Sequence, residues 1–381
     1  MLKRVPKDSK LLVISDTGMF EEVGHVFAFG PVLRELEYLA HYFKTITWIG
    51  FNKPNQSHNR SYQKITHQHI RTIFLKSTEG PNITDKLDIL TQYPKMYSII
   101  NNELKKHNYI HVRAPSNPAL IAMHLSKKYK DKQFWFKYAG SWVDSTSYTY
   151  NYQRNLLKKL KAPTKVTVNG QWPNQEKHIL AFENPCLTSD DRVLGEAMVS
   201  EKIFQAKPNY CFIGNLNANK GVSPLLKAFA GIERSAYDTI HVVGDGKLKD
   251  QLVAITKLYQ LNVVFHGTLQ KSEVINIYKT SQFITLPSKS EGFPKVISEA
   301  LNYGCIPLVT KISCIDQYVV DDKNGFLIAS QEVNHIKDTI QRSLKLTDEK
   351  YDTMIRTNHA MAKKFTYGYY VERIMNSIYD F

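Results

Sequence analysis

The sequence lacks long apolar runs and low-complexity tracts, and it has only four cysteines among 381 residues. These cysteines form no Cys-x-x-Cys pair and sit inside apolar stretches, which favours buried thiols in a reducing compartment such as the cytosol. The start, MLKRVPKDSKLLVISD, places basic residues before the short apolar run LLVI. That run is too short for the core of a signal peptide or for a membrane span, so we expect it to form a first β-strand.

What is present predicts a packed globular protein. Hydrophobic residues make up 43% of the chain and aromatic residues 12%, which excludes a fibrous or disordered protein. Single hydrophobic cores rarely grow beyond a few hundred residues, so a chain of this length favours two domains, each with its own core.

Acidic residues are too few to balance the basic ones. The formal net charge is +15, and residues 1–200 alone hold 28 Lys+Arg against 17 Asp+Glu. Such a surplus indicates an anionic partner, which the composition leaves open as a phosphorylated substrate, a nucleic acid or an acidic membrane face. A surface that is merely soluble is the alternative.

Short β-rich apolar runs alternate with segments of helical period, which is typical of parallel sheets built from βαβ units. Two series of such runs predict two open α/β domains, with a boundary near residues 190–207 where the alternation is lost. Ligands of open α/β sheets bind outside the carboxyl ends of the strands, so functional motifs should follow strands. The predicted strands are 11–15, 45–50, 72–75, 109–113, 134–138 and 165–169 in the first half, and 209–214, 239–244, 262–267, 283–287, 306–310 and 325–329 in the second.

Two carboxylates stand eight positions apart in the stretch LPSKSEGFPKVISEALNYGCIPLVT. Pro294 suits the first turn of a helix that Gly304 closes. This places Glu291 in the loop after a strand and Glu299 about one and a half turns into the helix. Carboxylates accept hydrogen bonds from sugar hydroxyls, and a helix start attracts an anion such as a pyrophosphate. The spacing therefore suits a nucleotide sugar, and a surface helix with two solvated glutamates is the alternative.

The segment EGFPKVISE has the Glu-x7-Glu spacing and resembles the signature of retaining glycosyltransferases of the GT-B fold, family 4 (group 1) in particular. The resemblance implies an α/β protein of two facing Rossmann-like domains with a cleft between them. It also implies that Glu291 lies near the donor sugar and that Glu299 binds the ribose hydroxyls. The resemblance further implies that the donor sugar and the pyrophosphate contact the backbone of Gly292, Phe293, Pro294, Lys295 and Val296.

A second motif, FIGNLNANKGVSPLLKAF, resembles the family segment that supplies two cations to the pyrophosphate. It follows a strand that ends at Gly214, and the resemblance implies that Gly214 and Asn215 lie at the donor nucleotide. Lys220 matches one of the two cations. Asn215 occupies the usual arginine position, where it offers only a neutral hydrogen bond, whereas Lys220 can neutralise a leaving phosphate. Further on, the loop of VVFHGTL resembles one that faces the base, so we assign Thr268 to the nucleotide and a structural role to the His266 side chain.

The first half resembles the family more loosely. Arg113 ends the predicted strand YIHVR, where it suits either a clamp for a phosphate or carboxylate or a structural ion pair. Gly18 and Gly24 fall in an expected loop after the first strand and allow close backbone approach to a diphosphate or an acceptor. Many relatives have a histidine at the end of the next strand, but here the sequence is Tyr138-Ala139-Gly140, so the backbone or Lys137 and Trp142 would have to replace it.

Residues 151–163, NYQRNLLKKLKAP, predict a basic amphipathic helix with three leucines on one stripe. Such a helix suits an anionic membrane surface, and the alternative is an ordinary surface helix whose leucines join the core. The flanking cations are Arg154, Lys158, Lys159 and Lys161. The tail resembles the final helix of the family, which crosses back to the first domain, so Phe365, Tyr369, Tyr370 and Tyr379 are expected to be packing residues.

The resemblance predicts three segments, which are an acceptor-binding domain (1–200), a donor-binding domain (201–365) and the final helix (366–381). The implied activity is a retaining hexosyl transfer from a UDP- or GDP-sugar to a hydroxyl of a glycan or lipid-linked acceptor, in cell-envelope polysaccharide or glycolipid synthesis. Glu291, Lys220 and Arg113 are the predicted catalytic residues. We expect no required cofactor or metal, and a cytoplasmic location with peripheral association at the inner membrane face.

Two other functions are kept as alternatives. A nucleotide-sugar epimerase or hydrolase on the same fold is favoured by the missing histidine of the first half. A basic nucleic-acid-binding protein is indicated only by the charge and the many tyrosines, since the sequence has no RNP-like strand, helix-turn-helix signature or zinc ligand set, and we expect no nucleic-acid partner.

Overall fold

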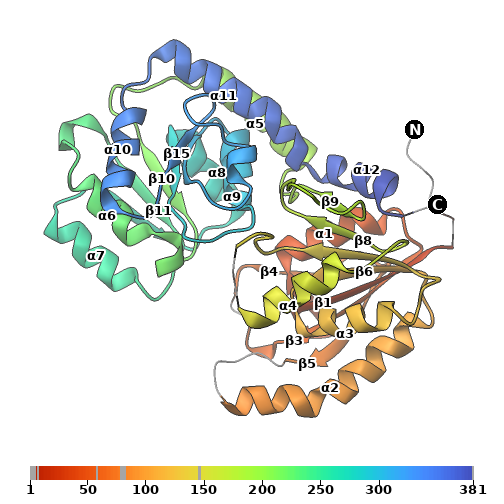
Figure 1. Cartoon of the computed structure of the whole chain (residues 1–381). Helices are drawn as coiled ribbons and strands as arrows, with labels where there is room; N and C mark the ends of the chain where they lie inside the picture. Colours follow the sequence, from red (N-terminus) through yellow and green to blue (C-terminus); the bar gives the residue numbers. More distant parts are fainter. Residues whose placement is uncertain (1–5, 7, 57–58, 78–82, 145–146, 380–381) are drawn as a thin grey trace. The chain divides into compact units, whose positions relative to one another are not determined.

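The computed structural model describes residues 6, 8–56, 59–77, 83–144 and 147–379, so residues 1–5 at the start of the predicted first segment lie outside it. The chain divides into two compact units (Figure 1). Unit 1 comprises Met1–Glu183 together with Tyr367–Phe381, and unit 2 comprises Asn184–Thr366. The sequence placed the boundary near 190–207, but much of that stretch is helix α5 (Ser189–Glu201) of unit 2. A capping box between Thr188 and Asp191 begins this helix.

Unit 1 is a twisted sheet whose parallel strands run in the order β5-β3-β1-β6-β7-β8-β9, with β2 antiparallel to β1 and β4 antiparallel to β2. The strands are β1 (Lys10–Glu22), β2 (His25–Phe29), β3 (Thr45–Asn52), β4 (Tyr62–Lys64), β5 (Ile70–Lys76), β6 (Tyr109–Ala114), β7 (Gln133–Tyr138), β8 (Lys165–Val168) and β9 (Ile179–Ala181). The helices are α1 (Gly30–Ala40), α2 (Ile83–Leu104), α3 (Asn117–Ser126), α4 (Tyr148–Lys158) and α12 (Tyr367–Ser377).

The two faces of this sheet are covered by different helices. Alternate residues of β1 point to opposite faces, as the period of a strand requires. Leu12 packs in one core cluster with residues of α2 and α3, whereas Leu11 packs in the other with α1 and α12. Helix α12 contributes Tyr370 and Ile374 to that second cluster, so the end of the chain is part of the core of unit 1.

The prediction of a loop directly after residue 15 is wrong. Strand β1 continues to Glu22, and the two residues Val23 and Gly24, both with positive φ, turn the chain into β2. Two positive φ values are what a tight hairpin needs, because that turn matches the twist of its strands. Phe20 of β1 stacks on Phe27 of β2 at 5.1 Å between ring centroids. Gly18 therefore lies within a strand.

Unit 2 is a parallel sheet with the order β12-β11-β10-β13-β14-β15. The α/β prediction is confirmed, since each strand predicted for the second half lies within one residue of its observed bounds. These strands are β10 (Tyr210–Ile213), β11 (Ile240–Val243), β12 (Val263–Gly267), β13 (Phe283–Leu286), β14 (Ile306–Thr310) and β15 (Phe326–Ile328). The helices besides α5 are α6 (Val222–Phe229), α7 (Lys249–Leu258), α8 (Lys271–Thr280), α9 (Lys295–Asn302), α10 (Val333–Ser343) and α11 (Asp348–Ala362).

Both sheets reverse their strand order once. In unit 2 the chain runs outward from β10 to β12 and then returns to β13 on the other side of β10. In unit 1 the same reversal separates β1 from β6. Loops that leave such a pair of strands diverge, and the crevice between them is the usual ligand site of an open α/β sheet.

Within the described residues, none of the helices combines the length and apolar character needed to cross a bilayer.

Gly221 fixes the approach of two loops in unit 2. It joins the short helix η2 (Ala218–Lys220) to α6 with a φ of 71°. A Cβ at this position would lie 2.2 Å from the carbonyl oxygen of Pro287, which follows β13. Both the left-handed backbone and the close contact therefore require glycine.

We expect the substitution Gly221→Ala to lower the free energy of unfolding by about 1–3 kcal/mol, because it adds left-handed strain and a collision with the backbone of Pro287. Gly368→Ala in α12 is the matched control. No atom lies within 4 Å of a Cβ there, so alanine should stabilise the helix by about 0.5–1 kcal/mol. Urea denaturation of the two variants measures both changes, and equal stability of Gly221→Ala and the parent chain would contradict the assignment.

Candidate functional site

The loops after β10 and β13 lie on either side of the strand reversal in unit 2 and are bonded to each other. The backbone amide of Lys289 donates to the carbonyl of Asn219 at 2.7 Å, and the side chain of Asn219 donates to the carbonyl of Ser290 at 2.9 Å. Gln331 donates to the carbonyls of Asn219 and Pro287 at 2.9 and 2.7 Å. The two loops are thus held as one edge of the crevice.

Lys220 and Glu291 meet at this edge. The Lys220 Nζ donates to Glu291 Oε1 in an ion pair whose side chains are 20% and 15% exposed. The backbone amide of Lys220 donates to Asn217 Oδ1 at 3.2 Å, which orders the loop that carries the cation. The arrangement puts a positive point charge and a hydrogen-bond acceptor side by side at a partly exposed position. That is what a diphosphate and a neighbouring sugar hydroxyl need.

Helix α9 begins one residue later than the sequence indicated. Pro294 has an extended ψ of 124° and is the N-cap, so Lys295 and Val296 are the first helical residues. The carbonyl of Pro294 accepts from the amide of Ile297 at 3.0 Å. The first turn of α9 still directs its N–H groups toward the β13–α9 loop, where the helix dipole favours an anion.

Phe293 anchors this loop through its side chain. The ring is 5% exposed and stacks on Phe365 at 5.2 Å between centroids, with Tyr318 at 4.8 Å. The carbonyl of Gly292 accepts a weak bond from Cys314 Sγ at 3.6 Å. Only the backbone of these two residues is therefore placed to serve a ligand.

Glu299 lies on the second turn of α9 and accepts a hydrogen bond from Tyr278 at 3.1 Å. Burial raises the pKa of Glu299, and the Tyr278 hydroxyl with the charges of Lys271 and Lys295 offsets only part of this shift. Lys271 also pairs with Asp191. Tyr278, Lys271 and Asp191 were not predicted, because no local motif marks them.

The other residues predicted at the nucleotide follow β10 and β12. Gly214 touches the end of β11, since a Cβ on Gly244 would lie 1.9 Å from the Gly214 carbonyl. Asn215 is exposed and accepts from Asn217 at 3.2 Å. Thr268 is exposed after β12, at the same edge of the sheet but two strands away from β10. The predicted nucleotide residues are thus spread along one edge, and only some of them adjoin the Lys220–Glu291 pair.

His266 has a structural partner. One of its ring nitrogens lies 3.0 Å from a ring nitrogen of His241, and burial lowers the pKa of both imidazoles. This is consistent with the structural role expected of its side chain.

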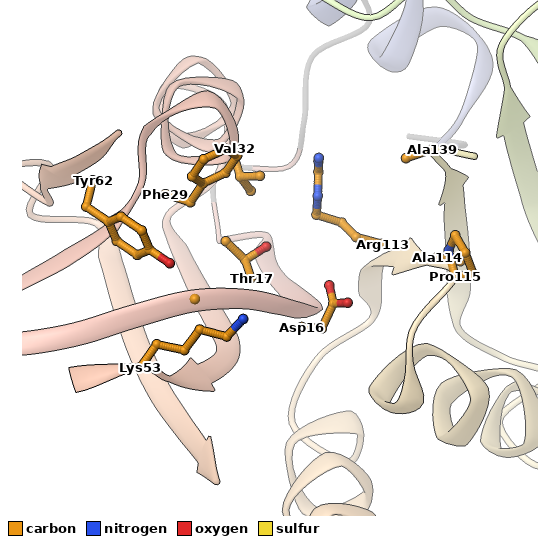
Figure 2. Close-up of a pocket in the computed structure, with 11 residues that line it drawn as sticks. Asp16, Thr17, Phe29, Val32, Lys53, Tyr62, Arg113, Ala114, Pro115 and Ala139 are labelled. Carbon is orange, nitrogen blue, oxygen red and sulfur yellow. The ribbon is translucent and has the colours of Figure 1, made fainter. Parts of the chain in front are cut away.

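Unit 1 has a cavity of about 350 Å³ at its own strand reversal (Figure 2). Residues of β1 and of the ends of β6 and β7 line it, together with Lys53 and Tyr62, which the sequence analysis did not identify. Figure 2 shows Lys53, Tyr62 and Arg113 around this space. The complete lining is Asp16, Thr17, Gly18, Phe29, Val32, Lys53, Tyr62, Arg113, Ala114, Pro115 and Ala139.

Gly18 gives this cavity its shape. The register of β1 against β3 shifts between Ile14 and Gly18, which carries Asp16 and Thr17 to the cavity wall. A Cβ on Gly18 would lie 2.3 Å from the Tyr62 hydroxyl. The missing side chain of Gly18 therefore makes room for the Tyr62 hydroxyl at the cavity wall. The backbone contact of Gly18 with a ligand stays a prediction.

Arg113 both lines the cavity and forms a structural ion pair. Its Nη1 donates to Glu35 Oε2 at 2.7 Å, and Lys137 Nζ donates to the same oxygen at 2.8 Å. The Tyr370 hydroxyl of α12 accepts from Lys137 at 3.2 Å. Glu35 is 2% exposed on its side chain, so the carboxylate is buried with two cations. This contact holds the guanidinium in one orientation at the cavity wall.

Lys137 was expected to help replace the missing histidine, but its ammonium group pairs with Glu35. Of the three residues Tyr138, Ala139 and Gly140, only Ala139 lines the cavity.

Arg154 of helix α4 was expected on the basic surface of this helix, and this expectation is wrong. Arg154 is buried, and its Nη1 donates to the carbonyls of Trp142 and Asp144 at 2.8 Å each. Leu157 and Leu160 are buried in the core. The leucine stripe therefore packs inward, and Arg154 is not available to an anionic surface.

Across the described parts of the chain, no cluster of three or more His, Cys, Asp or Glu residues is placed to hold a metal ion.

A family model described as Glycosyl transferases group 1 matches residues 195–361. Glycogen synthase of Flavobacterium johnsoniae is 25% identical over 240 residues, covering 58% of this chain and 50% of that protein. UDP-Gal:alpha-D-GlcNAc-diphosphoundecaprenol alpha-1,3-galactosyltransferase of Escherichia coli is 30% identical over 194 residues, covering 48% of each chain. The chain thus spans about half the length of these two relatives.

The fold is shared over nearly the whole chain. The crystal structure of Anabaena Alr3699/HepE in complex with UDP-glucose superposes with a TM-score of 0.69 and 15% identity, covering 97% of this chain and 98% of that one. At this identity the likeness establishes the fold, which is the GT-B fold of two Rossmann-like units. The family model over residues 195–361 and this fold together support a group 1 glycosyltransferase.

Proposed function

We propose that this protein transfers a sugar from a nucleotide-sugar donor to a hydroxyl acceptor with retained anomeric configuration, in the synthesis of a cell-envelope glycan or glycolipid. The observation that carries the proposal is the pairing of Lys220 with Glu291 at the strand reversal of unit 2, next to the first turn of α9. A cation, a carboxylate and a helix start in one place fit the diphosphate and the sugar of such a donor.

In the proposed complex the donor diphosphate lies at Lys220 and at the start of α9. Lys220 exchanges Glu291 for the phosphate oxygens and neutralises the charge that develops on the leaving group. Glu291, freed from the cation, accepts hydrogen bonds from the donor sugar and stabilises positive charge near its anomeric carbon. Glu299 accepts from the ribose hydroxyls. No residue in this scheme requires a metal.

The acceptor is proposed to bind in the cavity of unit 1, with Arg113 and Lys53 directing polar or anionic groups of the acceptor. The Anabaena structure holds UDP-glucose, which supports a UDP-sugar as donor. The name of the E. coli relative specifies transfer to a diphosphoundecaprenol-linked sugar, which supports a lipid-linked acceptor. We propose that the transfer takes place in the cytoplasm at the inner membrane face. None of the relatives named here is described as an epimerase or a hydrolase.

Release of nucleoside diphosphate tests the function. Purified protein is incubated with UDP- and GDP-sugars, with and without a bacterial lipid extract, in buffer containing EDTA. We expect release only when both one donor and the extract are present, and we expect EDTA to leave the rate unchanged. Equal release without the extract would identify a hydrolase, and conversion of the donor sugar without release would identify an epimerase.

Lys220→Ala should lower kcat by about 100-fold or more, because removal of one preorganised group that stabilises developing charge costs about that much. Lys227→Ala is the matched control, since Lys227 is an exposed lysine on α6. Steady-state kinetics with the active donor measures both variants. Unchanged kcat in Lys220→Ala would remove Lys220 from the site.

Glu299→Gln should have opposite effects on the stability of the protein and on its affinity for the nucleotide. The folded state raises the pKa of this carboxyl above 4.5, so it holds its proton at pH values where the unfolded chain has lost it. Stability therefore falls as pH rises from about 4.5 through the raised pKa, and the neutral amide avoids this cost. We expect a melting temperature at pH 7 equal to or above that of the parent chain, with a smaller difference at pH 4.

The same variant should bind the nucleoside diphosphate about tenfold more weakly, because a hydrogen bond to a charged acceptor is stronger than one to an amide. Isothermal titration at pH 7 measures the affinity. A lower melting temperature at pH 7 would contradict the unfavourable burial of the charge, and unchanged affinity would contradict the ribose contact.

A further inference from the structure

Unit 1 has a second cavity, of about 430 Å³, that is walled by lysines. Residues that follow the end of α3 and residues that follow the end of α4 line it. Apolar groups of Leu160, Ala162 and Pro163 form part of the wall. The lysines that line it are Lys127, Lys130, Lys132, Lys159 and Lys161.

Among the residues that the structure describes, these five cations have no acidic partner. Within the described ranges, none of them forms an ion pair with an aspartate or a glutamate. Lys132 is buried, and its Nζ donates to the carbonyl of His107 at 2.8 Å and lies 5.7 Å from the centre of the Tyr129 ring. Neutral groups thus solvate this charge. Like charges around one concave space repel each other and focus a positive potential into it.

The cavity is separate from the one that Arg113 lines. It adjoins the residues immediately before β7 and β8, at the amino ends of these strands, whereas Arg113 and Ala139 lie at the carboxyl ends of β6 and β7. Six residues of strand span roughly 20 Å. A ligand in the lysine cavity would therefore not touch the reacting groups of the proposed acceptor site.

We propose that this cavity binds an anionic phosphate group, borne by a small organic molecule or by an anionic lipid headgroup. Ammonium groups are point charges that bind phosphate oxygens without a fixed geometry, so several lysines can share one such group. The apolar part of the wall suits the organic portion of the same ligand. The site is independent of the sugar-transfer chemistry and would serve attachment or regulation.

Residue-resolved amine acylation of the whole chain tests the proposal. Protein is acylated with and without millimolar pyrophosphate, and also with vesicles of phosphatidylglycerol or of phosphatidylcholine, and each lysine is followed by mass spectrometry. We expect pyrophosphate to slow acylation of Lys127, Lys130, Lys159 and Lys161 at least threefold. Lys64 and Lys95, two exposed lysines elsewhere in unit 1, should react at an unchanged rate.

The double variant Lys159→Gln/Lys161→Gln should lose the protection of Lys127 and Lys130, and the control Lys64→Gln/Lys95→Gln should retain it. Both variants change only exposed side chains, so folding is preserved in each. Protection of Lys220 by pyrophosphate reports the donor site separately.

Three outcomes are distinguished. Protection by pyrophosphate supports a small phosphorylated ligand. Protection by phosphatidylglycerol vesicles alone, without an effect of phosphatidylcholine, supports a lipid headgroup as the source of the same phosphate chemistry. Acylation rates of the cavity lysines that neither pyrophosphate nor phosphatidylglycerol vesicles change overturn the proposal.

Discussion

The reversal of strand order between β10 and β13 is the constraint on which the candidate donor site depends. It brings Lys220 and Glu291 into contact although they are 71 residues apart. Gly221 makes this possible, because only a residue without a Cβ can pass the Pro287 carbonyl at that distance. The backbone bonds between the two loops then fix the pair in place. Sheet topology and one close contact thus bring the two loops together, and the positions of the charged side chains follow from these two features.

Both units hold a cation at the carboxyl ends of their strands by means of a carboxylate. In unit 2 this acid is partly exposed and can exchange partners, whereas Glu35 of unit 1 is buried with Arg113 and Lys137. A buried acid with two cations is costly to break, since loss of the acid would leave both charges without compensation. Arg113 is therefore a fixed element of its cavity, whereas the proposed donor binding requires Lys220 to leave Glu291 for a phosphate. A contact between cation and carboxylate thus fixes side chains in unit 1, and in unit 2 it is the contact that the proposed donor would replace.

The strands of unit 2 and the position of the loop between β13 and α9 were predicted well from the sequence, because both depend on local signals. A strand of unit 2 is buried on both faces and reads as a short apolar run, and the Gly-Phe-Pro turn marks the start of α9 within one residue. The hairpin of β1 and β2 was missed because Asp16, Thr17 and Gly18 resemble a loop, although burial of Met19 and Phe20 continues the strand. The boundary was misplaced because α5 is polar on much of its surface and has no clear apolar stripe to identify it as a helix of unit 2.

The partners of the site residues could not be predicted, because tertiary contacts alone define them. Glu35 lies 78 residues from Arg113 and 102 from Lys137, and in the sequence it is one of two glutamates on an amphipathic helix. For Arg113 the sequence left two alternative roles open, a ligand clamp and a structural ion pair. The structure shows that they do not exclude each other. A guanidinium has five N–H donors on a planar fork, so one edge can bind a buried carboxylate while the group still lines a cavity. In the proposed acceptor site the ion pair would make the clamp possible, since it orients the guanidinium before any ligand binds.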